Sequence, residues 1–355
     1  MNSKEAPHPH KRATQADIAA RVGISRATVS AALSESRFVS PELKAQILQA
    51  AEALHYVPDI LARSMKTNRT MTIGLVLPNI LSPVWATISR GVADVARSAG
   101  FSTLMYDTDE QCDVMQTALR NLRERRVDGI VLAPCGEPTA AALAQFIAET
   151  AMPIALIDRE IVELSLDTVV SDNASGTYQA TKHLLDAGRQ RIGLVNLPLA
   201  ISTGRDRLKG YQRALKEHGR PVADALIAVG GRGIEEGYRQ ADRLLSLSTD
   251  RRPDALLVSS HLMTLGALRA LRDRALRIPE DVAVIGFDDT AWASLIDPPL
   301  TVVNQQAYEI GSQGARLLLA RLTSGATDGA PRRIVLPTEL ICRRSCCAGH
   351  PTASQ

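Results

Sequence analysis

Two sets of residues in this 355-residue chain have side chains that could recognise another molecule. The first set lies near the N-terminus, and the guanidinium of Arg26 is its strongest member. It could donate two hydrogen bonds to O6 and N7 of a guanine; a phosphate contact or a solvated charge is an equally weighted alternative. Thr28 and Ser30 are better suited to bind phosphates or to pack against neighbouring residues. Ala31 could touch only the methyl group of a thymine. The whole set comprises Ser25, Arg26, Ala27, Thr28, Ser30 and Ala31.

The second set comprises the charged residues of two segments, Arg205-Asp206-Arg207 and Asp288-Asp289, each of which follows a predicted strand. Open α/β sheets bind ligands at the carboxyl ends of their strands. Arginine offers several donors and aspartate only acceptors, so together they suit a polyhydroxylated or otherwise polar ligand. Taken singly, each would more often be a surface charge. We find no G-x-S-x-G, HExxH or P-loop pattern and therefore predict no enzymatic activity.

The first set is carried by a predicted pair of short helices between residues 15 and 33. Thr14 can cap the first helix, with Asp17 three residues on, and Gly23 can end it in a left-handed conformation. Ser25 can then cap the second helix. This pattern predicts a helix-turn-helix unit whose second helix enters the DNA major groove, although an ordinary helical hairpin is the alternative.

A third helix is predicted from the sequence Ser40-Pro41-Glu42, which combines a cap, a proline at the first helical position and an acidic residue. Residues 14–57 thus form a three-helix head. Residues 1–13 are polar and are expected to be a disordered arm. Residues 58–66 could form a helix of about two turns, too short to be stable alone, and a polar linker follows to residue 70.

From about residue 14 to about residue 345, the sequence resembles the lactose/galactose repressor family. The matching segments are Val22-Gly23-Ile24-Ser25, Ala27-Thr28-Val29-Ser30, Val39-Ser40, Tyr56-Val57-Pro58, Leu61-Ala62-Arg63-Ser64 and Ile73-Gly74-Leu75-Val76. The resemblance implies a homodimer that binds double-stranded operator DNA. It also implies a core like that of periplasmic binding proteins, with a small effector bound between two lobes.

The resemblance further implies a hinge helix over residues 58–66 that contacts DNA. In the family, a leucine at the position of Met65 is levered into the minor groove, and methionine is apolar and flexible enough for that role. Packing of Met65 against the dimer partner is the alternative. The resemblance and the helical pattern together give further DNA-contact candidates, namely Thr14, Leu61, Ala62, Met65 and Lys66.

By resemblance, Arg207 and Asp288 are the effector-binding pair, in the contexts Arg-Leu-Lys-Gly and Gly-Phe-Asp-Asp. Trp85 could stack on a sugar ring or pack in the core. His261 stands where many relatives carry aspartate, and it could also be a capping or core residue. Second-rank candidates for the cleft are Asp172, Thr203, Arg232 and Gln305.

From residue 71 the pattern alternates between short apolar runs and amphipathic segments, which predicts two doubly wound α/β subdomains. Predicted strands fall at 73–77, 102–106, 129–133, 154–157, 192–195, 226–229, 255–258, 282–287, 300–303 and 334–340. We assign about 71–170 and 303–330 to lobe 1, and about 171–302 and 331–345 to lobe 2. Residues 346–355 are a tail.

The composition fits this assignment. Residues 1–70 carry ten lysines or arginines against six acidic residues, a net charge of +4, whereas the rest of the chain is at −1. Five cysteines form no disulfide or metal-ligand pattern, so we expect reduced thiols, no metal and no cofactor. No apolar run reaches 18 residues and the N-terminus does not resemble a signal peptide, so we expect a cytoplasmic protein without a membrane partner.

Two other classes of protein share features with this sequence but fit it less well. A solute-binding protein would use the same core, but it would need a signal peptide and have no use for the head. A nucleotide-dependent enzyme is disfavoured because the glycines of Gly231-Arg232-Gly233-Ile234-Glu235-Glu236-Gly237 depart from G-x-G-x-x-G spacing and the glutamates would repel pyrophosphate. We therefore predict a dimeric repressor under effector control, whose effector, operator and higher oligomeric state the sequence does not specify.

Overall fold

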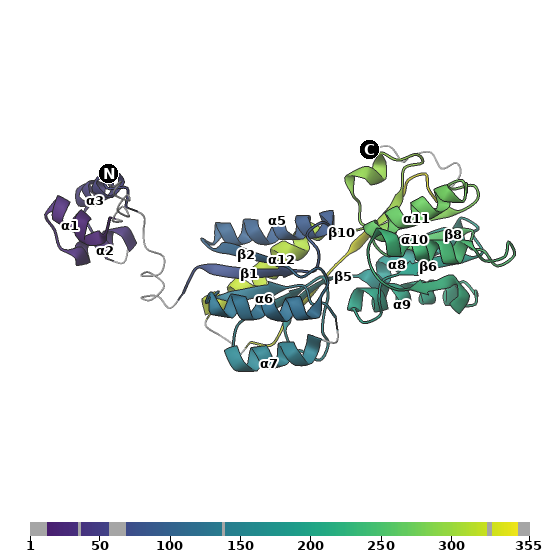
Figure 1. The fold of residues 1–355 in the computed structure, drawn as a ribbon, viewed down its shortest axis with the longest axis horizontal. Helices are drawn as coiled ribbons and strands as arrows, with labels where there is room; N and C mark the ends of the chain where they lie inside the picture. Colours follow the sequence, from purple (N-terminus) through teal and green to yellow (C-terminus); the bar gives the residue numbers. More distant parts are fainter. Residues whose placement is uncertain (1–12, 35–36, 57–68, 137–138, 325–328, 347–355) are drawn as a thin grey trace, which may run out of the picture. The chain divides into compact units, whose positions relative to one another are not determined.

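The structure is a computed structural model that describes residues 13–34, 37–56, 69–136, 139–324 and 329–346. The chain divides into two compact units, residues 1–70 and 71–355 (Figure 1). The first unit is called the head and the second the core, and each is described by itself. Within the described residues, no helix is long and apolar enough to cross a membrane.

In its described residues the head contains three helices, α1 (Gln15–Val22), α2 (Arg26–Ser34) and α3 (Pro41–Ala53). Thr14 and Asp17 form a reciprocal capping box at the start of α1, and Gly23 ends that helix with φ 77°. The Ser25 hydroxyl accepts a hydrogen bond from the Thr28 N–H (3.1 Å) at the start of α2. The predicted caps are therefore confirmed.

A small apolar core holds the three head helices together. Ile18, Val29 and Ile47, one from each helix, are fully buried. Ala19 is also buried, so a small residue lies where the helices approach closely. The third helix thus packs against the predicted pair of short helices, which gives the predicted three-helix head.

Lobe 1 of the core is a six-stranded parallel sheet in the order β11-β5-β4-β3-β1-β2. One face packs on α5 and α12 and the other on α6 and α7 (Figure 1). The strands are β1 (Thr72–Leu77), β2 (Ser102–Asp107), β3 (Gly129–Leu132), β4 (Ile154–Ile157), β5 (Asp167–Ser171) and β11 (Arg333–Leu336), and the helices are α5 (Pro83–Ser98), α6 (Cys112–Glu124), α7 (Ala140–Thr150) and α12 (Ala307–Ser324).

Lobe 2 repeats this plan with the order β12-β10-β9-β8-β6-β7, in which only β12 is antiparallel to its neighbour. Helices α10 and α11 cover one face and α8 and α9 the other. The elements are β6 (Ile192–Asn196), β7 (Ile227–Val229), β8 (Ala255–Val258), β9 (Ala283–Phe287), β10 (Thr301–Gln305) and β12 (Thr338–Ile341), with α8 (Asn173–Asp186), α9 (Ser202–Glu217), α10 (Ile234–Leu245), α11 (His261–Asp273) and the 3-10 turns η2 (Asp224–Leu226) and η3 (Ala291–Ser294).

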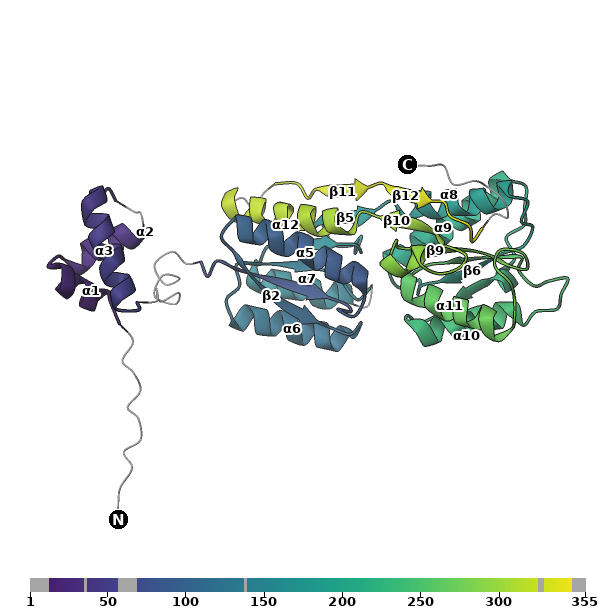
Figure 2. The same cartoon turned by 90° about the horizontal axis from the view of Figure 1, so that it is seen from above.

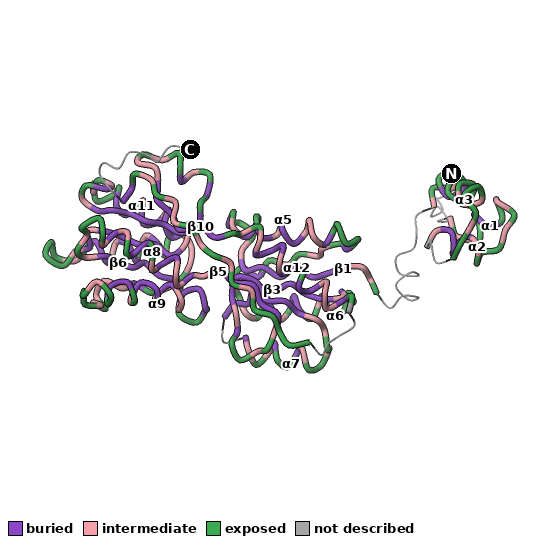
Figure 3. Tube along the Cα trace, turned by 180° about the vertical axis from the view of Figure 1, so that it is seen from behind, coloured by how far each residue is buried: buried purple, intermediate pink, exposed green. Residues whose placement is uncertain are grey.

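Buried apolar strands form the centre of both lobes (Figure 3). In lobe 1, Leu75 and Leu77 face α5 and α12, whereas Val76 faces α6. The alternation follows from the two-residue period of a strand, and burial on both faces explains the continuous apolar runs in the sequence.

The chain crosses between the lobes three times, after β5, after β10 and after β11 (Figure 2). The crossings are tied to each other by hydrogen bonds. The Asp172 N–H donates to the Leu336 carbonyl (2.8 Å), and the Gln306 side chain donates to the Pro337 carbonyl (3.4 Å). This bonded group of crossings forms a hinge.

The predicted lobe boundaries require correction. Residues 334–340 form two strands rather than one, because Pro337 separates β11 in lobe 1 from β12 in lobe 2. The boundary we placed at 331 therefore lies near 337, and the one at 303 lies near 306, since β10 stays in lobe 2. The sequence analysis also missed β5, where Asp167-Thr168-Val169-Val170-Ser171 has only two successive apolar residues.

Candidate functional site

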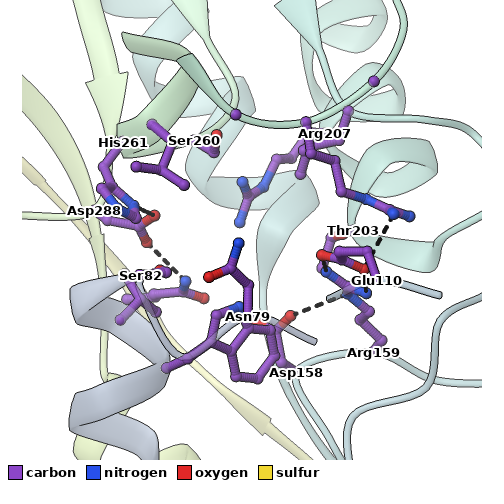
Figure 4. A pocket seen from close by; sticks show the side chains of 18 of the residues that line it. Asn79, Ser82, Glu110, Asp158, Arg159, Thr203, Arg207, Ser260, His261 and Asp288 are labelled. Carbon is purple, nitrogen blue, oxygen red and sulfur yellow. Dashed lines mark hydrogen bonds and ion pairs between the residues drawn. The ribbon is translucent and has the colours of Figure 1, made fainter. Parts of the chain in front are cut away.

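A cavity of about 330 Å³ lies between the two lobes of the core (Figure 4). Most of its lining residues follow the carboxyl ends of strands in both sheets, which is where open α/β sheets place their ligand sites. The lining includes Asn79, Ser82, Val84, Trp85, Asp109, Glu110, Asp158, Arg159, Leu197, Thr203, Arg207, Gly231, Arg232, Gly233, Ser260, His261, Leu262, Asp288 and Gln305.

Arg207 projects from α9 into this cavity and is almost completely buried, with 3% of its surface exposed. Its Nε donates to Asn173 Oδ1 (2.8 Å), and its Nη1 donates to the Ser259 carbonyl. The guanidinium also stacks over the ring of Phe287, 3.5 Å from the centroid. Burial lowers the pKa of Arg207, and the nearby carboxylates of Asp288 and Asp158 counteract that effect. The side chain is thus fixed before any ligand arrives.

Asp288 belongs to a series of hydrogen-bonded polar side chains that runs from lobe 2 to Ser171, at the end of β5 in lobe 1. It follows β9 with a left-handed backbone (φ 72°), and its Oδ1 accepts a hydrogen bond from Gln305 Nε2 (2.7 Å). Gln305 in turn accepts from the hydroxyl of Ser171 (3.0 Å). The His261 Nδ1 lies 3.6 Å from Asp288 Oδ2, and its Nε2 is buried without a hydrogen-bond partner. This series holds Asp288 and leaves one imidazole nitrogen for a ligand.

Trp85 and Thr203 also line the cavity. Trp85, at the start of α5, is 7% exposed and belongs to the buried cluster of lobe 1. Trp85 therefore packs in the core of lobe 1 and also lines the cavity, and its stacking on a sugar ring stays a prediction. The guanidinium of Arg159 lies over its ring at 5.6 Å from the centroid.

Asp172 is the exception among the predicted cleft residues, because it does not line the cavity. Its carboxylate accepts a hydrogen bond from the Ser175 N–H (2.9 Å) and caps α8. A polar residue at the end of a strand can serve either the ligand site or the next helix. Asp172 serves the helix.

The sequence analysis missed Asp158, Arg159 and Glu110, which line the lobe 1 side of the cavity. Asp158 follows β4 with φ 62°, and its N–H donates to Val169 in the next strand. Asp288 does the same after β9, with its N–H donating to Val303. β4 and β9 hold the same place in the two strand orders, so each lobe presents an aspartate to the cavity from an equivalent position.

Glu110 joins two arginines from different lobes. Both of its oxygens accept from the Arg159 guanidinium, at 2.7 Å each, and its Oε2 lies 3.1 Å from Nη1 of Arg232. Burial opposes ionisation of Glu110, but the two arginines outweigh it and lower the pKa of that carboxyl. At Asp158, burial prevails and raises the pKa of its carboxyl.

The head presents α2 as its candidate nucleic-acid surface. Ser25, Arg26 and Ala27 are exposed at its start, and Thr28 and Ser30 are partly exposed. Ala31 is only 9% exposed, which leaves little of its methyl group for a base contact. Thr14 is exposed, but its hydroxyl bonds to Asp17 in the capping box. Leu61, Ala62, Met65 and Lys66 lie outside the described residues.

Cysteines and metal ligands supply no second site in the described part of the chain. Cys112 and Cys135 are free thiols, and the Cys346 Sγ lies within hydrogen-bond distance of His183 and Thr301. Among the same residues, no group of three or more His, Cys, Asp or Glu side chains could hold a metal ion.

Comparison with known proteins identifies the family. Residues 14–59 match the family described as "Bacterial regulatory proteins, lacI family", and residues 181–346 match a "Periplasmic binding protein-like domain". The "HTH-type transcriptional repressor PurR" of Haemophilus influenzae (strain PittEE) is 32% identical over 335 residues, which cover 94% of this chain and 98% of that protein. The chain belongs to the lacI family.

Two solved structures of lacI-family regulators extend the comparison over the whole fold. The lac repressor dimer bound to operator and the anti-inducer ONPF is 26% identical, with a TM-score of 0.83, and the alignment covers 95% of this chain and 100% of that one. A complex of the transcriptional regulator CelR with cellobiose is 33% identical, with a TM-score of 0.71, and the alignment covers 94% and 100%.

Membership of the lacI family confirms the predicted class of function. The chain is a non-enzymatic transcriptional regulator that binds DNA through its helix-turn-helix head. In the two related structures, the bound small molecules are cellobiose for CelR and the anti-inducer ONPF for the lac repressor. The expected fold, a helical head joined to two doubly wound α/β lobes, is confirmed as well.

Proposed function

We propose that this lacI-family chain is a dimeric repressor whose effector is a sugar, a sugar derivative or another polar metabolite bound in the cavity between the lobes. The observation that carries the proposal is the preformed polar lining of that cavity. Arg207, Asp288 and Gln305 are buried and held by hydrogen bonds, with donors and acceptors brought together from separate elements. Such a lining suits a ligand with several hydroxyl or carbonyl groups.

The related CelR complex supports this choice, because its ligand, cellobiose, is polyhydroxylated. Seven predicted residues of this chain line the cavity and are proposed to bind the effector. They are Trp85, Thr203, Arg207, Arg232, His261, Asp288 and Gln305. Trp85 offers the face of an aromatic ring, on which the apolar face of a sugar can stack.

The DNA side of the function is assigned to α2, with Arg26 as the base-reading residue and Ser25, Ala27, Thr28 and Ser30 around it. The exposed start of α2 supports this assignment, since the first residues of a recognition helix reach the base edges. The proposal extends to Leu61, Ala62, Met65 and Lys66 as DNA contacts of the hinge segment. Because its target is chromosomal DNA, we also propose that the protein works in the cytoplasm, at the nucleoid.

The function is tested by selecting duplexes from random-sequence DNA with the full chain and measuring binding by fluorescence anisotropy. Sugars, sugar acids, polyols and nucleobases are then screened by thermal shift, because a ligand that binds only the folded state raises the melting temperature. We expect at least one stabilising compound to change the affinity for the selected duplex. Failure to enrich any sequence would contradict the repressor assignment, and stabilising compounds that leave DNA affinity unchanged would contradict effector control.

A further inference from the structure

At one end of the cavity, the hydrogen-bond donors of two cationic side chains outnumber the acceptors of the carboxylate between them. Two guanidinium groups, Arg159 from lobe 1 and Arg232 from lobe 2, meet at the single carboxylate of Glu110. The three side chains are 6%, 24% and 17% exposed, respectively. They are called the arginine pair and its carboxylate.

In the described residues, neither guanidinium has a hydrogen-bond acceptor for every one of its N–H donors. Arg159 binds Glu110 end-on through both Nη atoms, and Arg232 reaches the same carboxylate through Nη1. Among the residues that the structure describes, the Nε atoms of both arginines are buried and have no hydrogen-bond partner. Arginine has five N–H donors, and leaving a buried donor unpaired costs free energy. Each Nε–H therefore still needs an acceptor, and an oxygen of a ligand bound against these two lining residues could supply it.

The nearest other carboxylate does not fill this gap. Asp158 Oδ2 is 3.7 Å from Arg159 Nε, too far for a hydrogen bond. Burial raises the pKa of Asp158, which disfavours its charged form. Asp109 also lines the cavity, but it is exposed, so water screens its charge. Burial also lowers the pKa of Arg232, as expected where a guanidinium is incompletely compensated.

The position of Arg232 explains how a ligand could use both lobes at once. It lies in the glycine-rich segment Gly230-Gly231-Arg232-Gly233 between β7 and α10, whose sequence imitates a nucleotide-binding loop. Gly233 adopts φ 94°, a conformation that other residues rarely take. The segment thus directs one long cationic side chain across the cleft. Arg232–Glu110 is also the one ion pair between the lobes found in the described residues.

From this geometry we propose that the effector is anionic, with a carboxylate or phosphate group bound by the side-on edges of Arg159 and Arg232. The inference rests on the proposed function, since it concerns the same cavity. Glu110 is a positioning residue that holds the two guanidiniums together. An anion bound between them joins lobe 1 to lobe 2, so the same contact that selects the charge also favours closure of the cleft.

The test uses matched pairs of neutral and charged compounds with the full-length protein, by isothermal titration calorimetry at constant ionic strength. The pairs are D-galactose with D-galacturonate, D-glucose with D-gluconate, and D-ribose with ribose 5-phosphate. We expect a charged member to bind at least about tenfold more tightly than its neutral partner, as charge-assisted hydrogen bonds predict. Arg232→Gln should abolish that preference, and Arg232→Lys should retain part of it.

Arg239→Gln is the matched control, because Arg239 is an exposed arginine of α10 outside the cavity lining. It should keep the full preference. Equal affinity within every pair, absence of binding by every charged member, or a preference that persists in Arg232→Gln would each overturn the inference. Binding of neutral sugars that Arg207→Ala abolishes would leave the proposed function standing while this inference fails.

Discussion

The Arg207 guanidinium donates from Nε and Nη1 to the protein, stacks on Phe287 and lines the cavity. Arg207→Ala removes these donors, so we predict loss of the effector response with DNA affinity unchanged, because the head is a separate unit. Anisotropy of a labelled duplex, titrated with the compound found by thermal shift, measures both. Arg213→Ala, on the same helix and outside the cavity lining, is the control. A normal response in Arg207→Ala would remove this residue from the site.

Arg26 carries the corresponding prediction in the head. If its guanidinium binds a guanine in bidentate fashion, Arg26→Ala should weaken binding to the selected duplex by roughly 1–3 kcal/mol and relax specificity at one base pair. Competition assays against duplexes with single substitutions measure this change. An equal loss on selected and random DNA would instead identify Arg26 as a phosphate contact.

The residues that sequence reasoning found and missed differ in a simple way. Arg207 and Asp288 were found because each follows a predicted strand and matches a family pattern. Asp158 follows the apolar run 154–157 in the same manner, and that signal could have revealed it. Glu110 and Arg232 become partners only when two lobes far apart in sequence meet, and the order of residues alone does not contain that contact.

At the scale of elements, strands with continuous apolar runs were predictable even when short, whereas β5, which opens with polar residues, was missed. Apolar runs such as β1 and β9 are buried on both faces, and that burial is visible in composition. β5 was missed because Asp167 and Thr168 open the strand with polar side chains. Its place in the sheet depends on pairing with β4 and β11, which are distant or short segments.

Asp167 shows what holds this short strand. The Arg321 side chain from α12 donates to both of its carboxylate oxygens (2.8 and 2.9 Å), and the Arg332 N–H donates to Oδ1 (2.8 Å). Burial of Asp167 opposes its charge, but these hydrogen bonds prevail and lower the pKa of the carboxyl. One side chain thus joins three segments of lobe 1.

We therefore predict that Asp167→Asn destabilises the core by about 1.5–3 kcal/mol at neutral pH, the range for hydrogen bonds to charged groups. The pKa is lower in the folded state, so this stability is present above the unfolded value near 4 and is lost as the pH falls through the folded value. Urea unfolding between pH 2.5 and 7 should show the two proteins converging at the acidic end. Asp273→Asn, at an exposed aspartate, should differ little from the parent at any pH.

At the largest scale, the hinge and the cavity lie within one compact unit, the core. The three crossings hydrogen-bond to one another on the hinge side. Away from the hinge, the polar contacts between the lobes in the described residues are the Arg232–Glu110 ion pair and a hydrogen bond from the Glu160 N–H to the Ser202 hydroxyl (3.0 Å). A ligand that favours one separation of the lobes must act on the same equilibrium as these contacts.

Ser202→Ala tests this coupling with a small change. The variant removes the acceptor for the Glu160 N–H, which would stay unpaired in the closed core but could bind water once the lobes separate. A lost hydrogen bond costs the closed form about 1 kcal/mol, so the effector concentration at half-response should rise about fivefold. By linkage, the selected duplex must still change effector affinity by the same factor as the effector changes duplex affinity. Ser98→Ala, where the hydroxyl bonds only within its own helix, should leave the midpoint in place. An unchanged midpoint in Ser202→Ala would show that the observed contact between the lobes takes no part in the response.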